Sequence, residues 1–214
     1  MPGREILQGA RCRLEPLEAA RHAESLHAAY AEDADAREWT YLPYGPFADA
    51  EAYREWVEGV EGRDDVIFFA ILDAERGKPL GVASYLRIAP EVGSIEVGHL
   101  RFARALQRTA TSTEAMYLMM RNVFDGLGYR RYEWKCDCLN APSLAAARRL
   151  GFRFEGTFRN HLVTKGRNRD TSWLAITAEE WPEIRGGLEG WLDPSNFDDQ
   201  GVQRRPLSEL MPRP

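Results

Sequence analysis

The sequence lacks several features that define whole classes of proteins. Its 214 residues contain no internal repeat, no low-complexity block and no apolar run near the roughly 18 residues that a membrane-spanning helix needs. Basic residues are not in excess, since 28 Lys and Arg stand against 33 Asp and Glu, for a net charge of −5. A general nucleic-acid-binding protein would carry a clustered basic face. We therefore expect a soluble cytoplasmic protein with neither a membrane nor a nucleic-acid partner.

Cysteine is also scarce. The three thiols, Cys12, Cys136 and Cys138, are an odd number without the spacing of metal ligands, so we expect reduced cysteines, no disulfide scaffold and no metal. Cys136 and Cys138 share one face of a predicted strand with Tyr132 and Trp134. That stripe is typical of core packing and does not favour a nucleophilic thiol.

The remaining composition, 44% hydrophobic and 29% charged, is ordinary for a globular protein. A chain of this length supports one substantial hydrophobic core. We expect a single domain over residues 1–192, followed by an extended C-terminal tail over residues 193–214, which contains four prolines.

Hydrophobic periodicity predicts seven strands and five helices. The strands are expected at residues 10–16, 66–72, 81–89, 93–102, 131–138, 152–160 and 171–176, and a charged turn, Lys165 to Asp170, joins the last two. Residues 66–72 are apolar throughout, so this strand is expected to be covered on both faces. The helices are expected at residues 17–32, after a cap at Asp49, at residues 113–127 with Gly128 at the end, after a cap at Asn140, and from a Thr177–Glu180 capping box through Leu192. The strand–helix–strand unit over residues 93–138 requires one parallel pair in an otherwise antiparallel sheet. The predicted fold class is therefore mixed α/β, with helices flanking about seven strands.

One junction could bind an anion. After the strand at 93–102, a turn of small and hydroxylated residues leads into the most strongly predicted helix, at residues 113–127. The first backbone N–H groups of a helix are unpaired and lie at the positive end of its dipole, so they suit a phosphate. Gln107 and Arg108 add side-chain donors. The alternative is that the threonines at 111 and 113 merely cap the helix.

This junction resembles the cofactor motif of the GNAT superfamily, Gln/Arg-x-x-Gly-x-Gly/Ala. Here the stretch is Gln107-Arg108-Thr109-Ala110-Thr111-Ser112, with alanine and serine at the glycine positions. Its surroundings strengthen the likeness: the acidic strand Glu96-Val-Gly-His-Leu100 before it, then Asn140-Ala-Pro-Ser143 and Leu150-Gly-Phe152 after it. The phrase Gly151-Phe-Arg-Phe-Glu-Gly156 is similar to the Rim-type branch, which includes ribosomal-protein N-terminal acetyltransferases. The resemblance covers about residues 10–176 and implies the GNAT fold.

The resemblance also implies acetyl-CoA as the acyl donor and direct attack by an amine on its thioester. It makes Glu96 the first candidate for the base and His99 the alternative, if a bulge near Gly98 turns its side chain inward. Ser143 becomes the candidate proton donor to the thiolate, and the N–H near Leu100 the oxyanion donor. The expected cofactor-binding residues are Leu100, Phe102, Gln107, Arg108, Thr109, Ala110, Thr111, Ser112, Thr113, Asn140 and Ser143.

The acceptor amine is less defined. Trp39, Tyr41 and Tyr44, from a loop with four aromatic residues, could cover the amine or pack down as an anchor, and Arg159 lies where the family binds substrate. The leading expectation is acetylation of a protein N-terminal α-amine or a small amine metabolite. The alternatives are detoxification of an antibiotic or amino acid, and an acyl-CoA-binding sensor without turnover. The final helix and tail could support a homodimer, although no residue pattern demands one.

Overall fold

A computed structural model describes residues 1–32 and 36–212 of the chain, and its centre is a sheet of eight strands in the order β1-β2-β3-β4-β5-β6-β8-β7. The strands are β1 Leu7–Gln8, β2 Cys12–Pro16, β3 Val66–Asp73, β4 Pro79–Ala89, β5 Ser94–Phe102, β6 Arg131–Asp137, β7 Arg153–Thr164 and β8 Arg167–Thr177. Strands β5 and β6 are parallel, and the other neighbouring pairs are antiparallel. The predicted mixed sheet with one parallel pair is therefore confirmed.

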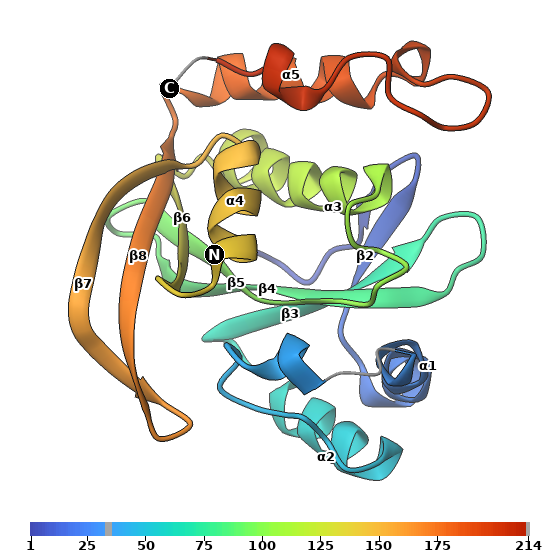
Figure 1. Ribbon diagram of the computed structural model, residues 1–214, viewed down its shortest axis with the longest axis vertical. Coiled ribbons are helices and arrows are strands. Elements are labelled where there is room, and N and C mark those ends of the chain that lie inside the picture. Colours follow the sequence, from blue (N-terminus) through green and yellow to red (C-terminus); the bar gives the residue numbers. More distant parts are fainter. Residues whose placement is uncertain (33–35, 213–214) are drawn as a thin grey trace.

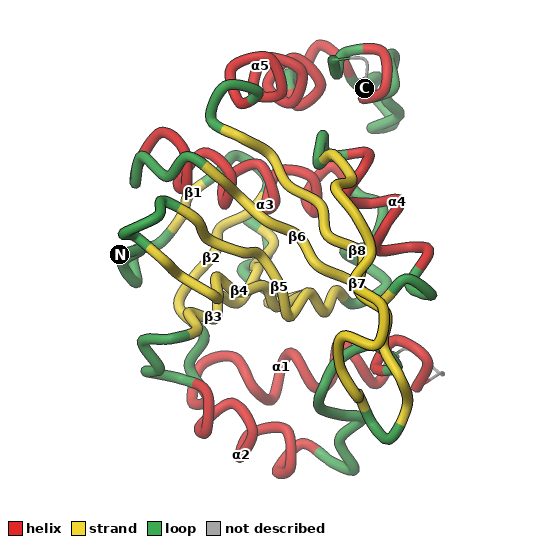
Figure 2. Tube along the Cα trace, turned by 90° about the vertical axis from the view of Figure 1, so that its left-hand side faces the viewer, coloured by secondary structure: helices red, strands yellow, loops and turns green. Residues whose placement is uncertain are grey.

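Five α-helices surround this sheet: α1 Ala19–Ala31, α2 Ala50–Val60, α3 Ala110–Arg121, α4 Ala141–Arg149 and α5 Trp181–Leu192. Helices α1 and α2 cover one face, whereas α3 and α4 cover the other, with α5 beyond α3 (Figure 1). The same layering is visible from the side in Figure 2. Within the described residues, none of the helices is long and apolar enough to cross a bilayer.

The sheet separates two hydrophobic cores. Along β3, Ile67, Phe69 and Ile71 belong to the core under α3 and α5. The alternate residues Phe68, Ala70 and Leu72 belong to the core under α1 and α2. Because successive side chains on a strand point to opposite faces, a strand between two cores must be apolar throughout. The expectation that residues 66–72 are covered on both faces is confirmed.

The structure differs from the sequence-based expectations mainly at element ends. Strand β1 was not predicted, because two residues carry no periodic signal. Strands β7 and β8 run almost to their turn at Lys165 and Gly166 and absorb most of what was expected to be a charged loop. Helix α3 begins at Ala110, three residues before the predicted start, and continues into a π-helical turn over Asn122–Gly126. Gly128 adopts a φ of 68° and ends it, as expected.

The C-terminal segment is the largest difference. Residues 193–212 form turns and two short 3-10 helices, Pro194–Asn196 and Leu207–Glu209, so the expected extended conformation is wrong for them; residues 213–214 lie outside the described part. Leu207 is buried in the core under α5, and the Asn196 amide donates to the carbonyls of Trp191 and Arg205. The prolines restrict regular helix there, but these contacts still fold the segment onto α5.

Candidate active site

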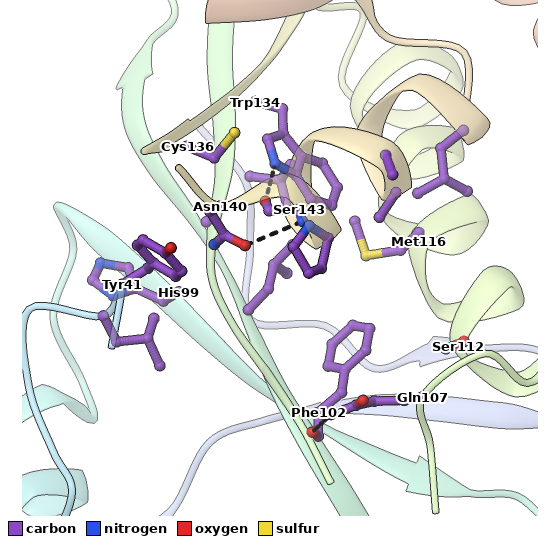
Figure 3. A pocket seen from close by; sticks show the side chains of 18 of the residues that line it. Tyr41, His99, Phe102, Gln107, Ser112, Met116, Trp134, Cys136, Asn140 and Ser143 are labelled. Carbon is purple, nitrogen blue, oxygen red and sulfur yellow. Dashed lines mark hydrogen bonds between the residues drawn. The ribbon is translucent and has the colours of Figure 1, made fainter. Parts of the chain in front are cut away.

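The main cleft opens where the parallel strands β5 and β6 separate. Their pairing runs from Ser94–Arg131 to Val97–Trp134 and then stops, although both strands continue. The space beyond that point is a cleft of about 1630 Å³, lined by the ends of β5 and β6, the starts of α3 and α4, the β7–β8 hairpin and residues 37–43. Figure 3 shows Asn140 and Ser143 in the middle of this cleft, Gln107 and Ser112 towards one end, and Tyr41 and His99 towards the other.

A bulge in β5 directs His99 toward this cleft. The register with β4 jumps from Ser84–Gly98 to Val82–Arg101, so His99 and Leu100 lie opposite a single residue. His99 adopts a φ of 53°, a left-handed conformation that is uncommon outside glycine. The predicted bulge is confirmed, and its consequence is that Glu96 and His99 both line the cleft despite their alternation in sequence.

Glu96 lies at the centre of a buried charge network. Its carboxylate oxygens lie 2.7 Å from Arg87 Nη1 and 2.7 Å from Lys135 Nζ, and the side chain is 4% exposed. Lys135 also contacts Glu133 at 2.7 Å and lies over the Trp173 ring, 3.7 Å from its centroid. The candidate base Glu96 is therefore ion-paired, at a position that also lines the cleft.

His99 is packed against aromatic rings. Its imidazole stacks on Tyr44 with a centroid distance of 5.5 Å and contacts the Phe68 ring at 4.9 Å. Burial, together with the positive charges of Arg87 and Arg63, lowers the pKa of His99 to about 4. The ring is therefore neutral at physiological pH and is a weak base.

At the start of α3, local hydrogen bonds hold the predicted anion-binding turn. Thr109 is the N-cap, and its hydroxyl accepts from the Ser112 N–H at 3.1 Å, so the threonines at 111 and 113 are not the cap. Gln107 Nε2 donates to the Phe102 carbonyl at 2.9 Å. Since Ala110 and Ser112 lie in the right-handed first turn, a Cβ is tolerated at these two glycine positions of the motif.

The left-handed residue of this turn is Arg108, with a φ of 59°, a strain that the sequence did not predict. Among the expected cofactor-binding residues, Leu100, Phe102, Gln107, Arg108, Thr109, Ala110, Ser112, Thr113, Asn140 and Ser143 line the cleft, and Thr111 does not.

At the start of α4, Ser143 offers a hydroxyl to the cleft. The Asn140 side chain caps this helix by accepting from the Ser143 N–H at 3.2 Å. Ser143 Oγ accepts from Trp134 Nε1 at 3.0 Å, so its own hydrogen remains available for donation. Neighbouring Cys136 is buried, and that burial raises the pKa of its thiol, although a hydrogen bond with Ser143 opposes the change. A protonated thiol is a poor nucleophile, which agrees with the packing role expected for Cys136.

The aromatic residues of the loop over 39–47 divide between the cleft and the core. Tyr41 lines the cleft and donates its hydroxyl to the Leu139 carbonyl at 2.9 Å. Trp39 is buried between Tyr30 and Phe47 as an anchor, and Tyr44 packs on Trp56 and His99. Arg159 is exposed on β7. The residues that line the cleft do not include Arg159, Trp39 or Tyr44.

Several lining residues were not singled out from the sequence. They are Arg87, Lys135, Arg149, Arg169, Thr171 and, from the C-terminal segment, Phe197 and Gln203. The one available signal was Lys135, a cation in the middle of an alternating strand whose opposite face is apolar. The others come from segments that only the tertiary structure brings together.

The cleft reverses the charge balance of the chain. Its lining includes seven cationic side chains, Arg37, Arg87, Arg104, Arg108, Lys135, Arg149 and Arg169, and three carboxylates, Glu38, Glu96 and Asp137. The whole chain has more acidic than basic residues, 33 against 28. Such a local excess of positive charge attracts anions. No group of three or more metal-binding side chains occurs among residues 1–32 and 36–212.

Comparison with known proteins agrees with this geometry. The model of the acetyltransferase (GNAT) domain matches residues 11–153. A crystal structure of a GCN5-related N-acetyltransferase from Brucella melitensis superposes with a TM-score of 0.95 at 43% identity, over 98% of this chain and 95% of that one. An uncharacterized N-acetyltransferase, p20 of Bacillus licheniformis, is 26% identical over 66% of this chain and 80% of its own.

The RimL ribosomal L7/L12 alpha-N-protein acetyltransferase shares the fold, with a TM-score of 0.69 at 21% identity, over 81% of this chain and 94% of that one. At that identity the likeness concerns the fold and leaves the Rim-type branch a hypothesis. The domain match and the similarity to the Brucella structure together show that this chain belongs to the GNAT family of N-acetyltransferases.

Proposed function

We propose that the chain transfers an acetyl group from acetyl-CoA to an α-amine by direct attack within a ternary complex. The observation that carries this proposal is the separation of β5 and β6. It opens one cleft to the start of α3, to the bulge at His99 and to the hydroxyl of Ser143. Anion binding, oxyanion stabilisation and proton donation can therefore occur along a single path.

The end of the cleft near α3 fits the pyrophosphate of acetyl-CoA. In the first turn of α3, the Thr109 side chain and carbonyl take up the N–H groups of Ser112 and Thr113. The N–H groups of Ala110 and Thr111 then remain for a ligand at the positive end of the helix dipole. Arg104 and Arg108 supply further positive charge beside them.

The middle of the cleft suits the thioester. Ser143 can donate its hydrogen to the departing sulfur, because its bond from Trp134 occupies a lone pair of the oxygen and not the hydrogen. The N–H of Leu100 follows the bulge and is the proposed oxyanion donor. Acetyl-CoA itself supplies the activated acetyl group.

The charges around the acceptor favour an α-amine over a lysine-like amine. A peptide α-amine has a pKa of about 8, and an alkyl amine about 10, so the α-amine loses its proton more easily. Nearby cations favour the neutral amine further. Glu96, though ion-paired, is the proposed end point for the released proton through water, since His99 has a pKa of about 4.

A thiol-release assay with acetyl-CoA tests the proposal against peptides with free N-termini, amino acids and alkyl amines. We expect turnover with α-amines. Ser143→Ala should lower kcat by about 100-fold or more with little change in the affinity for acetyl-CoA, and the exposed Ser208→Ala serves as the matched control. Binding of acetyl-CoA without turnover on any amine, unchanged by Glu96→Gln, would overturn the enzymatic proposal. Turnover restricted to small amines would instead indicate a detoxifying enzyme.

A further inference from the structure

Arg169, on β8, is a half-buried cation in the wall of the cleft. Its Nε donates to the hydroxyl of Thr171 at 3.1 Å, which is a neutral partner. Among residues 1–32 and 36–212, no carboxylate forms an ion pair with this guanidinium. An arginine that is partly desolvated and bound only to a neutral group retains its charge and its remaining N–H donors for a ligand.

Two other cations of the cleft differ from Arg169 in this respect. Arg87 and Lys135 both lie 2.7 Å from the Glu96 carboxylate, and Lys135 also lies 2.7 Å from Glu133. Their charges are therefore largely compensated within the protein. The positive charge of Arg169 has no such compensation from a described carboxylate.

Thr171 holds the Arg169 side chain in place. Its side chain is fully buried, and it bonds both Arg169 Nε and, at 3.0 Å, His161 Nδ1. Since a buried hydroxyl normally uses its hydrogen, Thr171 accepts from Arg169 and donates to His161. Both of these partners line the cleft. The guanidinium is thus oriented by a defined hydrogen-bond chain rather than free at the surface.

Arg169 also lies close to the centre of the site. Thr171 pairs with Asp137 across β6 and β8, next to the Cys136–Ser172 pair. The charge of Arg169 acts on the Cys136 thiol, which in turn neighbours Ser143. A ligand group bound to Arg169 would therefore lie in the same cleft as Cys136 and Ser143, on the wall formed by β6 and β8.

We propose that Arg169, oriented by Thr171, binds a carboxylate of the acceptor, so that the preferred substrates are α-amines that carry a carboxylate near the amine. This inference rests on the proposed acetyltransfer. The carboxylate can come from a free amino acid or from an acidic residue next to a peptide N-terminus. The planar guanidinium matches a carboxylate with two parallel hydrogen bonds, and the anion offsets the positive wall that a simple cationic amine would meet.

Matched pairs of acceptors test this proposal in the intact protein. One arm compares alanine with alaninamide, and the other compares Ala-Asp-amide with Ala-Asn-amide, which distinguishes the two sources of carboxylate. In at least one arm we expect the carboxylate member to have a kcat/KM about tenfold higher or more. Arg169→Gln should abolish that preference by raising the KM of the carboxylate member. The kcat of that member, and the kcat/KM of the amide member, should change little. Arg169→Lys should retain part of it, because a point charge remains without the planar fork.

Arg76→Gln, at an exposed arginine on the β3–β4 turn, is the matched control and should keep the preference. Equal use of both members by the unmodified protein in both arms would overturn the proposal. So would an equal loss on both members in Arg169→Gln, which would indicate a structural role.

A separate binding measurement distinguishes failure of this inference from failure of the proposed function. Calorimetry on the protein–CoA complex should show tighter binding of N-acetylalanine than of N-acetylalaninamide, and Arg169→Gln should remove the difference. That result without turnover on any amine would contradict acetyltransfer and support the carboxylate site. Equal binding of the two probes would contradict the site.

Discussion

Two charged side chains each bind three backbone groups of a distant segment, one on each side of the cleft. On the cofactor side, Glu114 of α3 accepts from the N–H groups of Ala10, Arg11 and Cys12 at 3.2, 2.6 and 2.8 Å. On the acceptor side, Lys165 at the β7–β8 turn donates to the carbonyls of Trp39, Tyr44 and Gly45 at 2.9, 3.0 and 2.6 Å.

These two contacts, which we call the Glu114 and Lys165 clamps, differ in burial. Glu114 is 5% exposed, and a Cβ on Gly9 would lie only 2.5 Å from its carboxylate, so the N-terminal turn closes tightly over it. Lys165 is exposed, and its charge is screened by water. The cofactor side is therefore built into the core, whereas the acceptor side is held by a surface contact between two loops. The comparison indicates a rigid cofactor site and an adjustable acceptor site.

The largest expected effect tests the rigid side. Glu114→Ala should lower the free energy of unfolding by about 4 kcal/mol, because three buried or partly buried N–H groups lose their acceptor. Denaturant unfolding measures this loss, with Glu179→Ala, at an exposed glutamate, as the control. A loss below about 1 kcal/mol would show that water replaces the carboxylate, and the contrast between the two clamps would disappear.

The intermediate expected effect is a dependence of stability on pH that is caused by His99. Burial lowers its pKa to about 4 in the folded state, against 6.5 when it is free, so the unfolded chain gains the proton first as the pH falls. The stability that neutral His99 contributes is full above about pH 6.5 and is lost as the pH falls to 4. His99→Asn tolerates the same left-handed backbone and removes the titration.

Between pH 7 and pH 4, we expect the unmodified protein to lose about 2–3 kcal/mol more unfolding free energy than His99→Asn. Unfolding curves collected across this range provide the measurement. Parallel pH profiles for the two proteins would contradict the burial of a neutral imidazole.

The smallest expected effect tests the adjustable side. Lys165→Met should change the free energy of unfolding by less than about 1 kcal/mol, because the contact is exposed. It should nevertheless raise the KM of the acceptor several-fold, since Tyr41 and Thr164 line the cleft from the two loops that Lys165 joins. Affinity for acetyl-CoA should not change. Lys78→Met, at another exposed lysine, is the control. A change in the affinity for acetyl-CoA alone would contradict the assignment of the Lys165 contact to the acceptor side.

How much of a site could be predicted from the sequence depends on how far apart along the chain its interacting residues lie. Hydrogen bonds between residues three apart in the chain could be predicted from the sequence. The Asn140 cap, which binds the Ser143 N–H, was predicted at the right residue. The cap of α3 is Thr109, a few residues before the threonines that were expected. The bulge at Gly98 was expected for the family and is present. The contacts of Lys165 and of Tyr41 with Leu139 span about a hundred residues and have no signature in the sequence.

The sequence by itself determined the order of the helices and of every strand except β1, the strand that is covered on both faces and the hydroxylated turn at residues 107–113. Each of these depends on periodicity or on neighbours within one helical turn. The tertiary structure alone decided that Glu96 is ion-paired with Arg87 and Lys135, and that no carboxylate within the described part of the chain pairs with Arg169. The physical reason is that charge compensation depends on distances between strands, and these are set only when the sheet assembles.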